Sequence, residues 1–284
     1  MNYQWYPGHM TKAVRMMREE IRLVDIVIEL LDARIPLSSI NPDIDTLASG
    51  KGRLVVLNKY DLADERLSAD FERYFEKKGY VVVKTDSRDS QSVKKISEAV
   101  MAAGNEKFER DRKKGILNRP VRAMVCGIPN VGKSTLINSL AKKASAKTGN
   151  KPGVTRGKQW IKLNKQVELL DTPGILWPKF EDRETGIKLA LIGTINDDII
   201  DHEELAVKLI DICRALNEDI LKDRYGEGVL ASQDPVEILT AVAKSRGALL
   251  KGGEYDLNRA ARLLLDDFRS GRLGRITLDR PPVN

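Results

Sequence analysis

The sequence predicts an α/β domain with a mostly parallel sheet, followed by a small all-helical domain. Over the first 184 residues, short apolar runs of strand length alternate with helical patterns, which is typical of sheets covered by helices on both faces. From about residue 185 onwards, the apolar residues recur at helical spacing throughout. We therefore expect two domains, residues 1–184 and residues 185–284.

Three strands are expected in the first part of the chain, each an apolar run that ends at a polar segment. They cover residues 25–31, 54–57 and 80–83. An amphipathic helix is expected from about Thr11, because apolar residues recur there at three- and four-residue spacing. Another helix is expected over residues 68–78, since Gly79 supplies the glycine that commonly follows a helix C-terminus.

The middle of the chain is less regular. Residues 104–120 are charged and poorly periodic, and we interpret them as a helix end and a connector. Residues 142–157 are rich in lysine and glycine, a composition that favours a mobile loop. A β-hairpin is expected after it, from residues 159–163 and 167–170.

The predicted helical domain is expected to bind RNA. Asp234 and Asp256 are predicted helix caps, and arginines crowd the C-terminal end. These are Arg259, Arg262, Arg269, Arg272, Arg275 and Arg280. The chain carries a net charge of +7, and residues 1–187 alone carry +10, from 34 basic and 24 acidic residues. A basic surface suits a polyanion, for which we expect RNA rather than DNA; ordinary solubilising charge is the alternative.

Composition and cysteine content restrict the class of protein. The apolar fraction of 42% and the charged fraction of 31% are typical of a globular protein. Cys126 and Cys213 are the only cysteines, so no disulfide framework is predicted and a reducing compartment is indicated. No apolar run approaches membrane-spanning length, and the N-terminus lacks an apolar signal core. We expect a cytoplasmic protein without a membrane partner.

A phosphate-binding loop lies in mid-chain. Gly127–Ser134 follows an apolar run, precedes a helical pattern and has the G-x-x-x-x-G-K-[ST] spacing. Glycines let backbone N–H groups turn toward one anion, and the next helix presents its positive end to it. The predicted nucleotide contacts are Asn130, Val131, Gly132, Lys133, Ser134 and Thr135. This loop indicates a nucleoside triphosphate.

The tetrapeptide Asn58-Lys59-Tyr60-Asp61 indicates that the base is guanine. A carboxylate at Asp61 can accept hydrogen bonds from guanine N1–H and N2–H₂, a donor pair that adenine lacks. The stem of Lys59 can lie across the base, and Asn58 can brace the phosphate-binding loop. We assign all four residues to nucleotide binding.

Magnesium is expected at the phosphates. Ser134 would bind Mg²⁺ directly, Asp171 would hold it through water, and Thr155 is the candidate for a second hydroxyl ligand. The Gly174 N–H would contact the γ-phosphate. These groups provide the positioning and charge neutralisation that phosphoryl transfer needs.

The order of these motifs is permuted, because N-K-x-D precedes the phosphate-binding loop. In this order the chain resembles the circularly permuted GTPases. With its N-terminal Trp5–Met10 segment, its Asp32-Ala33-Arg34-Ile35-Pro36 motif and its helical C-terminal domain, it is most similar to ribosome biogenesis GTPase A, the RbgA/YlqF type. The resemblance covers essentially the whole chain. It implies a GTPase of late large-subunit (50S) assembly that binds rRNA and is stimulated by the ribosome.

One motif departs from the usual pattern. The base-contacting loop normally reads Ser-Ala-Lys, and here we match Asp86-Ser87-Arg88 to it. Asp86 and Ser87 are expected to contact guanine through backbone N–H groups.

His9 and Asn130 are the candidates for a role in hydrolysis. Ile175 stands where many GTPases have the glutamine that orients water, so another group must do this. The resemblance implies that His9 swings in when the partner is bound; a structural cap or an rRNA contact is the alternative. Asn130 resembles the asparagine of potassium-dependent GTPases, which implies a K⁺ ion at the phosphates in place of an arginine finger.

Three other functions are compatible with parts of the sequence. A GTP-regulated rRNA-binding scaffold with incidental hydrolysis is the main alternative. A permuted GTPase of the small subunit would bring a zinc module, and this sequence has no Cys/His cluster. An ATPase or kinase would leave Asn58–Asp61 unexplained. We expect a monomer with GTP or GDP, Mg²⁺ and K⁺ as its small ligands.

Overall fold

The computed structural model describes Arg15 and residues 17–116, 119–148, 160–164, 166–171 and 182–282. These residues form two compact units. The sheet unit comprises the described residues up to 171 together with residues 279–282, and the helical unit comprises residues 182–278. The predicted boundary at residue 185 assigned the C-terminal residues to the helical domain, whereas residues 279–282 make their contacts with the sheet unit.

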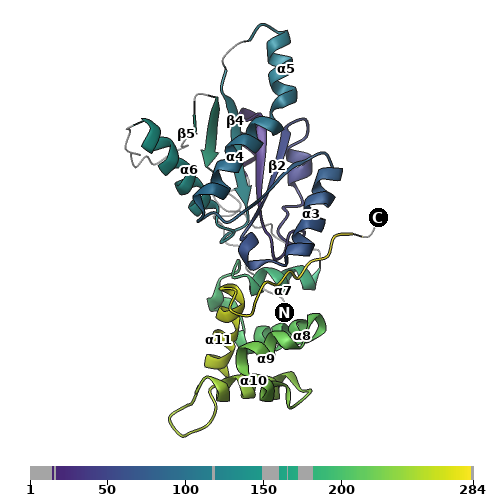
Figure 1. Ribbon diagram of the computed structural model, residues 1–284, viewed down its shortest axis with the longest axis vertical. Helices are drawn as coiled ribbons and strands as arrows, with labels where there is room; N and C mark the ends of the chain where they lie inside the picture. Colours follow the sequence, from purple (N-terminus) through teal and green to yellow (C-terminus); the bar gives the residue numbers. More distant parts are fainter. Residues whose placement is uncertain are drawn as a thin grey trace. The chain divides into compact units, whose positions relative to one another are not determined.

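The sheet unit is built on six described strands in the order β3-β2-β1-β4-β6-β5 (Figure 1). The strands are β1 (Ile26–Asp32), β2 (Gly52–Asn58), β3 (Val81–Thr85), β4 (Val121–Gly127), β5 (Trp160–Lys162) and β6 (Val167–Asp171). All neighbours are parallel except β5, which pairs with β6 as the predicted antiparallel hairpin. All seven residues of β1 are buried, as expected for an apolar strand at the centre of a sheet covered on both faces. The predicted α/β class is confirmed.

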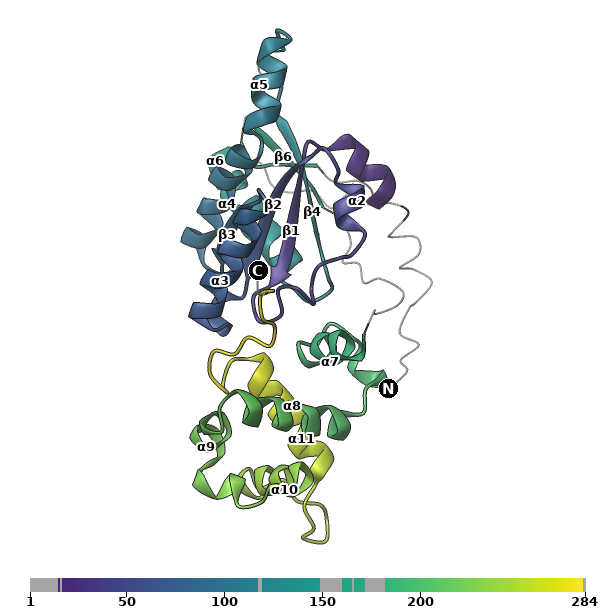
Figure 2. The same cartoon turned by 90° about the vertical axis from the view of Figure 1, so that its right-hand side faces the viewer.

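Helices cover both faces of this sheet. They are α2 (Ile44–Leu47), α3 (Glu65–Lys77), α4 (Ser90–Ala103), α5 (Asn105–Lys113) and α6 (Lys133–Thr148), with the 3₁₀ turns η1 (Ile21–Leu23) and η2 (Tyr60–Leu62). Figure 2 shows α4 and α6 on one side of the sheet and α2 on the other. On the α2 side, Met17, Ile21 and Val24 pack with Met124 of β4 in one apolar cluster. This packing holds the C-terminal part of the predicted N-terminal helix against the sheet.

Helix α3 shows how local sequence sets an element. The Asp64 carboxylate accepts a 2.8 Å hydrogen bond from the Leu67 N–H and caps the helix start. Phe71 and Phe75, one turn apart, are almost fully buried against the strand residues of a second apolar cluster. Gly79 adopts a φ of +80° just after the helix, a left-handed conformation that glycine adopts without strain.

Two segments, expected to be a helix end with a connector and a loop, are helical over longer stretches than predicted. Residues 105–113 form α5 although they lack apolar periodicity, because Glu, Lys and Arg have high helix propensity and Lys107 pairs with Asp111 at 3.0 Å. Helix α6 continues to Thr148, over the first part of the predicted loop 142–157, where alanine and lysine favour a helix. The rest of that predicted loop lies outside the described residues.

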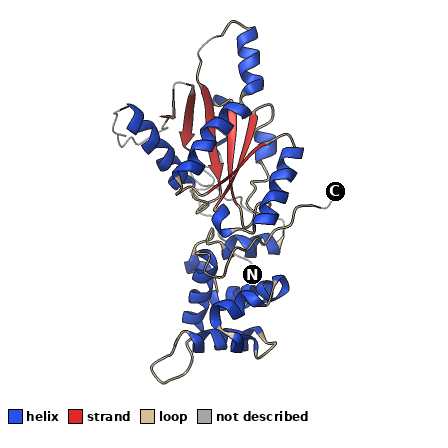
Figure 3. Cartoon of the chain, viewed as in Figure 1, coloured by secondary structure: helices blue, strands red, loops and turns tan. Residues whose placement is uncertain are grey.

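The helical unit contains α7 (Arg183–Leu191), α8 (His202–Leu216), α9 (Asp219–Tyr225), α10 (Pro235–Ser245) and α11 (Leu257–Arg269), with the turns η3 (Asp197–Ile199) and η4 (Glu227–Leu230), and Figure 3 shows its helical character. The predicted caps are confirmed: Asp234 accepts from the Val236 N–H and Asp256 from the Arg259 N–H, both at 2.9 Å. In the part of the chain that the structure describes, no helix is both long and apolar enough to cross a membrane.

A buried carboxylate joins the helices of this unit. Asp267 of α11 is 3% exposed and accepts hydrogen bonds from Arg224 at 2.7 and 3.0 Å, from the Tyr225 hydroxyl at 2.9 Å and from Arg272. Arg246 lies 3.5 Å away. Burial alone would raise the pKa of Asp267, but the hydrogen bonds from Arg224 and its neighbours lower it to about 2.

This carboxylate predicts how the helical unit responds to acid. Because the folded-state pKa lies below the unfolded value of about 3.9, the stabilisation is complete above pH 4 and is lost as the pH falls toward 2. Asp267→Asn should lower the free energy of unfolding at pH 7 by about 2 kcal/mol. It should also flatten the pH dependence between pH 4 and 2, measured by thermal or urea unfolding.

The matched control is Asp266→Asn, which changes the exposed neighbouring carboxylate of the same helix. It should leave both the stability at pH 7 and the acid dependence close to those of the unaltered chain. Equal acid profiles for Asp267→Asn and the unaltered chain would contradict the assignment.

Candidate nucleotide-binding site

The site lies at the carboxyl ends of three parallel strands. In the strand register, Asp32 at the end of β1 pairs with Asn58 at the end of β2, and Leu30 of β1 pairs with Gly127 at the end of β4. Side chains and loops that follow these strands therefore meet at one edge of the sheet, where ligands bind in open α/β folds.

The phosphate-binding loop follows β4 and leads directly into α6, as predicted. A Cβ on Gly127 would lie 2.6 Å from the carbonyl oxygen of Leu30, and one on Gly132 would lie 2.4 Å from Asn58 Nδ2. Gly132 also has a φ of +98°. Both positions therefore require glycine, the first for packing on β1 and the second for contact with Asn58.

The loop is directed at the start of α6. Lys133 is the first residue of the helix and is 8% exposed, whereas Ser134 and Thr135 in the same turn are exposed. N–H groups in the first turn of a helix have no intrahelical acceptor and carry the positive end of the helix dipole. Asn130 has a φ of +60°, a left-handed conformation that asparagine tolerates better than most residues.

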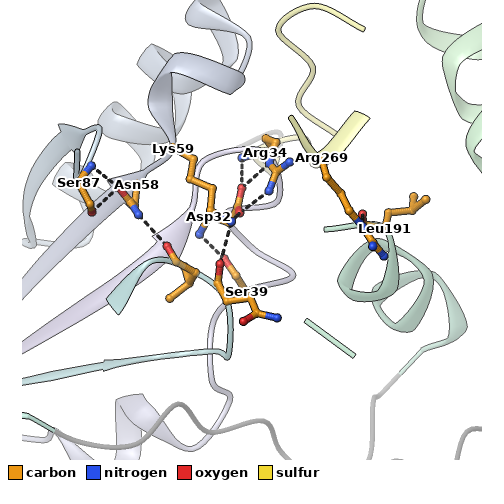
Figure 4. Close-up of polar contacts among 10 residues, drawn as sticks. Asp32, Arg34, Ser39, Asn58, Lys59, Ser87, Leu191 and Arg269 are labelled. Carbon is orange, nitrogen blue, oxygen red and sulfur yellow. Dashed lines mark hydrogen bonds and ion pairs between the residues drawn. The ribbon is translucent and has the colours of Figure 1, made fainter. Parts of the chain in front are cut away.

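Asn58 joins the base-reading and phosphate-binding segments (Figure 4). Its amide is 2% exposed and donates from Nδ2 to the Val131 carbonyl at 2.7 Å. Its Oδ1 accepts from the Ser87 N–H at 3.0 Å and the Ser87 hydroxyl at 2.7 Å. The carbonyl of Ser87 in turn accepts a 2.9 Å bond from the Ser139 hydroxyl of α6. Three segments of the site are thus held by one amide.

This geometry corrects the role predicted for Ser87. Its N–H was expected to contact guanine, but it donates to Asn58 instead, so Ser87 supports the site through Asn58. The Asp86 carboxylate accepts bonds from the Arg88 N–H and guanidinium at 2.8–3.2 Å. These bonds do not involve the Asp86 N–H, whose contact with guanine stays a prediction. The hydrogen bond from Arg88 lowers the pKa of Asp86.

Lys59 makes a second bridge between the two segments. It has a φ of +56°, and its Nζ donates to the Asn130 carbonyl at 2.8 Å. The same Nζ lies 3.1 Å from Oδ2 of Asp32. The carbonyl and the carboxylate thereby fix where the Lys59 stem lies, so that its methylenes can cover one face of a base.

Asp61 is poised for a ligand. One carboxylate oxygen, Oδ2, accepts from Arg88 at 2.6 Å, whereas the other, Oδ1, is buried and has no hydrogen-bond partner among the described residues. A buried acceptor left unpaired is unfavourable by about 1–3 kcal/mol, and the N–H groups of guanine would satisfy it. The neighbouring Tyr60 hydroxyl donates to Glu65 at 3.1 Å, so that hydroxyl is directed at α3.

Asp32 and Arg34 belong to the motif at residues 32–36, and the sequence pattern predicts no role for either. Asp32 is fully buried and Arg34 is 1% exposed; the guanidinium donates to both carboxylate oxygens, at 2.9 and 2.8 Å. Burial would raise the pKa of Asp32, but Arg34 and then Lys59 hold it well below its usual range. A carboxylate and an arginine two residues apart at the end of a mostly apolar strand were the available signal.

Several predicted residues cannot be placed. His9, Thr155 and Gly174 lie outside the described residues, as does the side chain of Asp171. The backbone of Asp171 ends β6 and pairs with Val125 of β4, next to the phosphate-binding loop. The predicted donor set of hydroxyl and carboxylate oxygens suits Mg²⁺, the divalent ion that GTPases generally use.

Known proteins are similar to this chain over nearly its whole length. A family model described as 50S ribosome-binding GTPase matches residues 122–240. The Ribosome biogenesis GTPase A of Bacillus cereus is 48% identical over 281 residues, which cover 99% of this chain and 95% of that protein. The Thermotoga maritima protein of the same name is 32% identical over 279 residues, covering 98% and 94%. Mitochondrial ribosome-associated GTPase 1 of Mus musculus is 38% identical over 299 residues, covering 98% and 90%.

Solved structures agree. GDP-bound YlqF superposes with a TM-score of 0.67 at 29% identity, covering 94% of this chain and 99% of that one. GNP-bound YlqF from T. maritima gives a TM-score of 0.68 at 29% identity, covering 96% and 100%. The fold extends over nearly the whole of both chains.

The geometry of Asp61 predicts base selectivity. In Asp61→Asn the amide loses one acceptor for the guanine N–H groups but gains a donor for the carbonyl at C2 of xanthine. GDP affinity should fall on the order of 100-fold, whereas XDP affinity should rise, as measured by competition against a fluorescent nucleotide. Glu65→Gln changes a carboxylate next to the site that accepts from the Tyr60 hydroxyl, and it should leave the preference for GDP unchanged. A variant that still prefers GDP would contradict the role of Asp61.

A substitution at Gly132 tests the role of the Asn58 amide in nucleotide binding. Gly132→Ala should drive the amide of Asn58 away from Val131, because a Cβ would approach Nδ2 to 2.4 Å. We expect loss of nucleotide binding by calorimetry, with the helical unit still folded by circular dichroism.

The family model and the geometry of the site indicate the same class of protein. The family model begins on β4, just before the phosphate-binding loop, and excludes Asn58–Asp61, as a permuted motif order requires. Near-complete coverage at 48% identity extends the likeness to the base-reading residues as well. The chain therefore belongs to the Ribosome biogenesis GTPase A family of circularly permuted GTPases, and it is an enzyme that binds and hydrolyses GTP.

Proposed function

We propose that this GTPase assists late assembly of the large (50S) ribosomal subunit and that the ribosome stimulates its hydrolysis of GTP. The observation that carries this proposal is full-length similarity to proteins named Ribosome biogenesis GTPase A, together with a family model described as 50S ribosome-binding. We further propose that the protein acts in the cytoplasm and as a monomer.

The charge of the surface supports an RNA partner. In the helical unit, Arg259, Arg262 and Arg275 are exposed. In the sheet unit, α5 and the residue after it expose Arg110, Lys113 and Lys114. Phosphate groups of rRNA would neutralise these side chains and release counterions, so binding should weaken as the salt concentration rises.

The catalytic groups follow from the motif order. When bound, Mg²⁺ would neutralise charge on the β- and γ-phosphates. Ser134, Asp171 and Thr155 would hold it, Lys133 would contact the β- and γ-phosphates, and Gly174 would contact the γ-phosphate. Because Ile175 replaces the usual glutamine, we propose that His9 orients the attacking water once the ribosome is bound.

A monovalent cation would complete the site. We propose that the side-chain oxygen of Asn130 helps to hold K⁺ against the phosphates, where the ion would stabilise charge that an arginine finger stabilises elsewhere. The left-handed backbone at Asn130, with its carbonyl held by Lys59, supports a fixed position for that residue.

The stimulation is tested by GTP turnover with and without 50S subunits, both mature and immature. We expect subunits to raise turnover at least tenfold and His9→Ala to abolish most of this increase, because water is then no longer oriented. Basal turnover without subunits should change little. If subunits bind tightly but leave turnover unchanged, the alternative function, a GTP-regulated rRNA-binding scaffold with incidental hydrolysis, is favoured.

The cation is tested by comparing turnover in K⁺ and in Na⁺. We expect K⁺ to be better by about tenfold, which corresponds to about 1.4 kcal/mol in the barrier. Asn130→Gly is the matched variant, since glycine keeps the left-handed backbone but removes the side-chain oxygen. It should reduce the difference between the two ions, and equal rates in K⁺ and Na⁺ for the unaltered chain would contradict a potassium site.

A further inference from the structure

A buried turn connects the nucleotide site to the last described residues of the chain. This segment, the Asp32–Ser39 turn, follows β1 and precedes α2. Of its eight residues, seven are buried and Leu37 is half-buried. One end contacts the N-K-x-D loop, and the other contacts Asp279, 241 residues later than Ser38.

The nucleotide end of the turn holds Lys59 by two routes. The Ala33 N–H donates to the Asn58 carbonyl at 2.8 Å, immediately before Lys59. The Asp32 carboxylate lies 3.1 Å from the Lys59 ammonium. These contacts secure both the backbone that enters the left-handed Lys59 residue and the charge at the end of its side chain.

The turn itself is closed by short internal bonds. The Ser39 hydroxyl accepts from the Asp32 N–H and donates to the Pro36 carbonyl, both at 3.2 Å. The Ile35 N–H donates to the Asp32 carbonyl at 2.9 Å. A turn cross-linked in this way transmits a displacement of one end to the other instead of absorbing it.

The far end of the turn is bound by the carboxylate of Asp279. The Oδ2 of Asp279 accepts from the Ser38 N–H and its Oδ1 from the Ser38 hydroxyl, both at 2.8 Å. Asp279 is 3% exposed and Ser38 is 8% exposed. Charge-assisted bonds to a carboxylate that is removed from water are stronger than neutral ones, so this pair fixes where Ser38 lies.

We propose that Asp279 is a positioning residue for the guanine nucleotide: it holds the Asp32–Ser39 turn, and the turn in turn holds Lys59 beside the base. The residues that follow the helical unit thus complete the nucleotide site, although they touch no part of it directly. This inference depends on the guanine-nucleotide site and not on the proposed role at the ribosome.

The turn acts on the phosphate-binding loop through Lys59, which donates to the Asn130 carbonyl, but Asn58 also holds that loop at the Val131 carbonyl. This second contact sets the kinetic signature. Loosening of the turn releases Lys59, which contributes to binding in both the ground state and the transition state. Lys133 and Ser134 begin α6, and the bond from Asn58 to Val131 keeps the loop before them in place when Lys59 is released. Uniform binding is therefore lost, so KM rises while kcat is unchanged.

The test uses the full chain with Asp279→Ala. We expect roughly a fivefold increase in the KM for GTP and in the Kd for GDP, with kcat within about twofold of the unaltered chain. Asp279→Asn should restore both values, because an amide oxygen can accept from the Ser38 N–H while its NH₂ donates to the Ser38 hydroxyl. Arg280→Ala, an exposed neighbour, is the control and should have no effect.

Two results would overturn the proposal. One is an unchanged KM and Kd in a folded Asp279→Ala protein. The other is a fall in kcat at unchanged KM, which is the sign of a smaller folded fraction. If Asp279→Ala does not fold, Ser38→Ala removes only the hydroxyl bond; it should raise KM in the same direction by a smaller factor, and an unchanged KM there would also refute the proposal.

Discussion

The nucleotide site depends on the amide of Asn58. Its three hydrogen bonds connect the end of β2 to the phosphate-binding loop and to the base-contacting loop at Ser87. Because this amide is buried, loss of the Val131 contact would leave Nδ2 without its acceptor, at about 1–3 kcal/mol. The N-K-x-D segment and the phosphate-binding loop are far apart in sequence, so non-covalent contacts must hold them together. Asn58 and Lys59 make these contacts, and Gly132 is required because a side chain there would clash with the Asn58 amide.

Permutation of the chain leaves this geometry intact because the sheet, not the motif order, assembles it. Parallel β1, β2 and β4 deliver Asp32, Asn58 and Gly127 to the same edge, whichever strand comes first. The order of the segments does change which residues lie near each end of the chain. Here the chain leaves the helical unit at residue 278, and its next residues are those that hold the Asp32–Ser39 turn.

Buried carboxylates with cationic partners recur in both units. Asp32 is paired with Arg34 and Lys59, and Asp267 with three arginines and a tyrosine. Glu29 of β1 is the contrast: burial raises its pKa to about 7 despite Arg53 at 2.8 Å, and its Oε1 has no partner among the described residues. Partner number and geometry, rather than burial alone, therefore decide which buried acid remains charged.

The sequence by itself determined the α/β class, the permuted motif order and the guanine-specific loop, because each is written in local spacing: apolar runs, glycine positions and a tetrapeptide after a strand. It also placed the caps at Asp234 and Asp256. Only the tertiary structure decided that Ser87 serves Asn58, that Asp32 and Arg34 form a buried pair with Lys59, and that Asp279 contacts Ser38. These are contacts between residues up to 241 positions apart, for which local pattern carries no signal. Helices α5 and α6 were underestimated for a related reason, since propensity rather than apolar periodicity extends them.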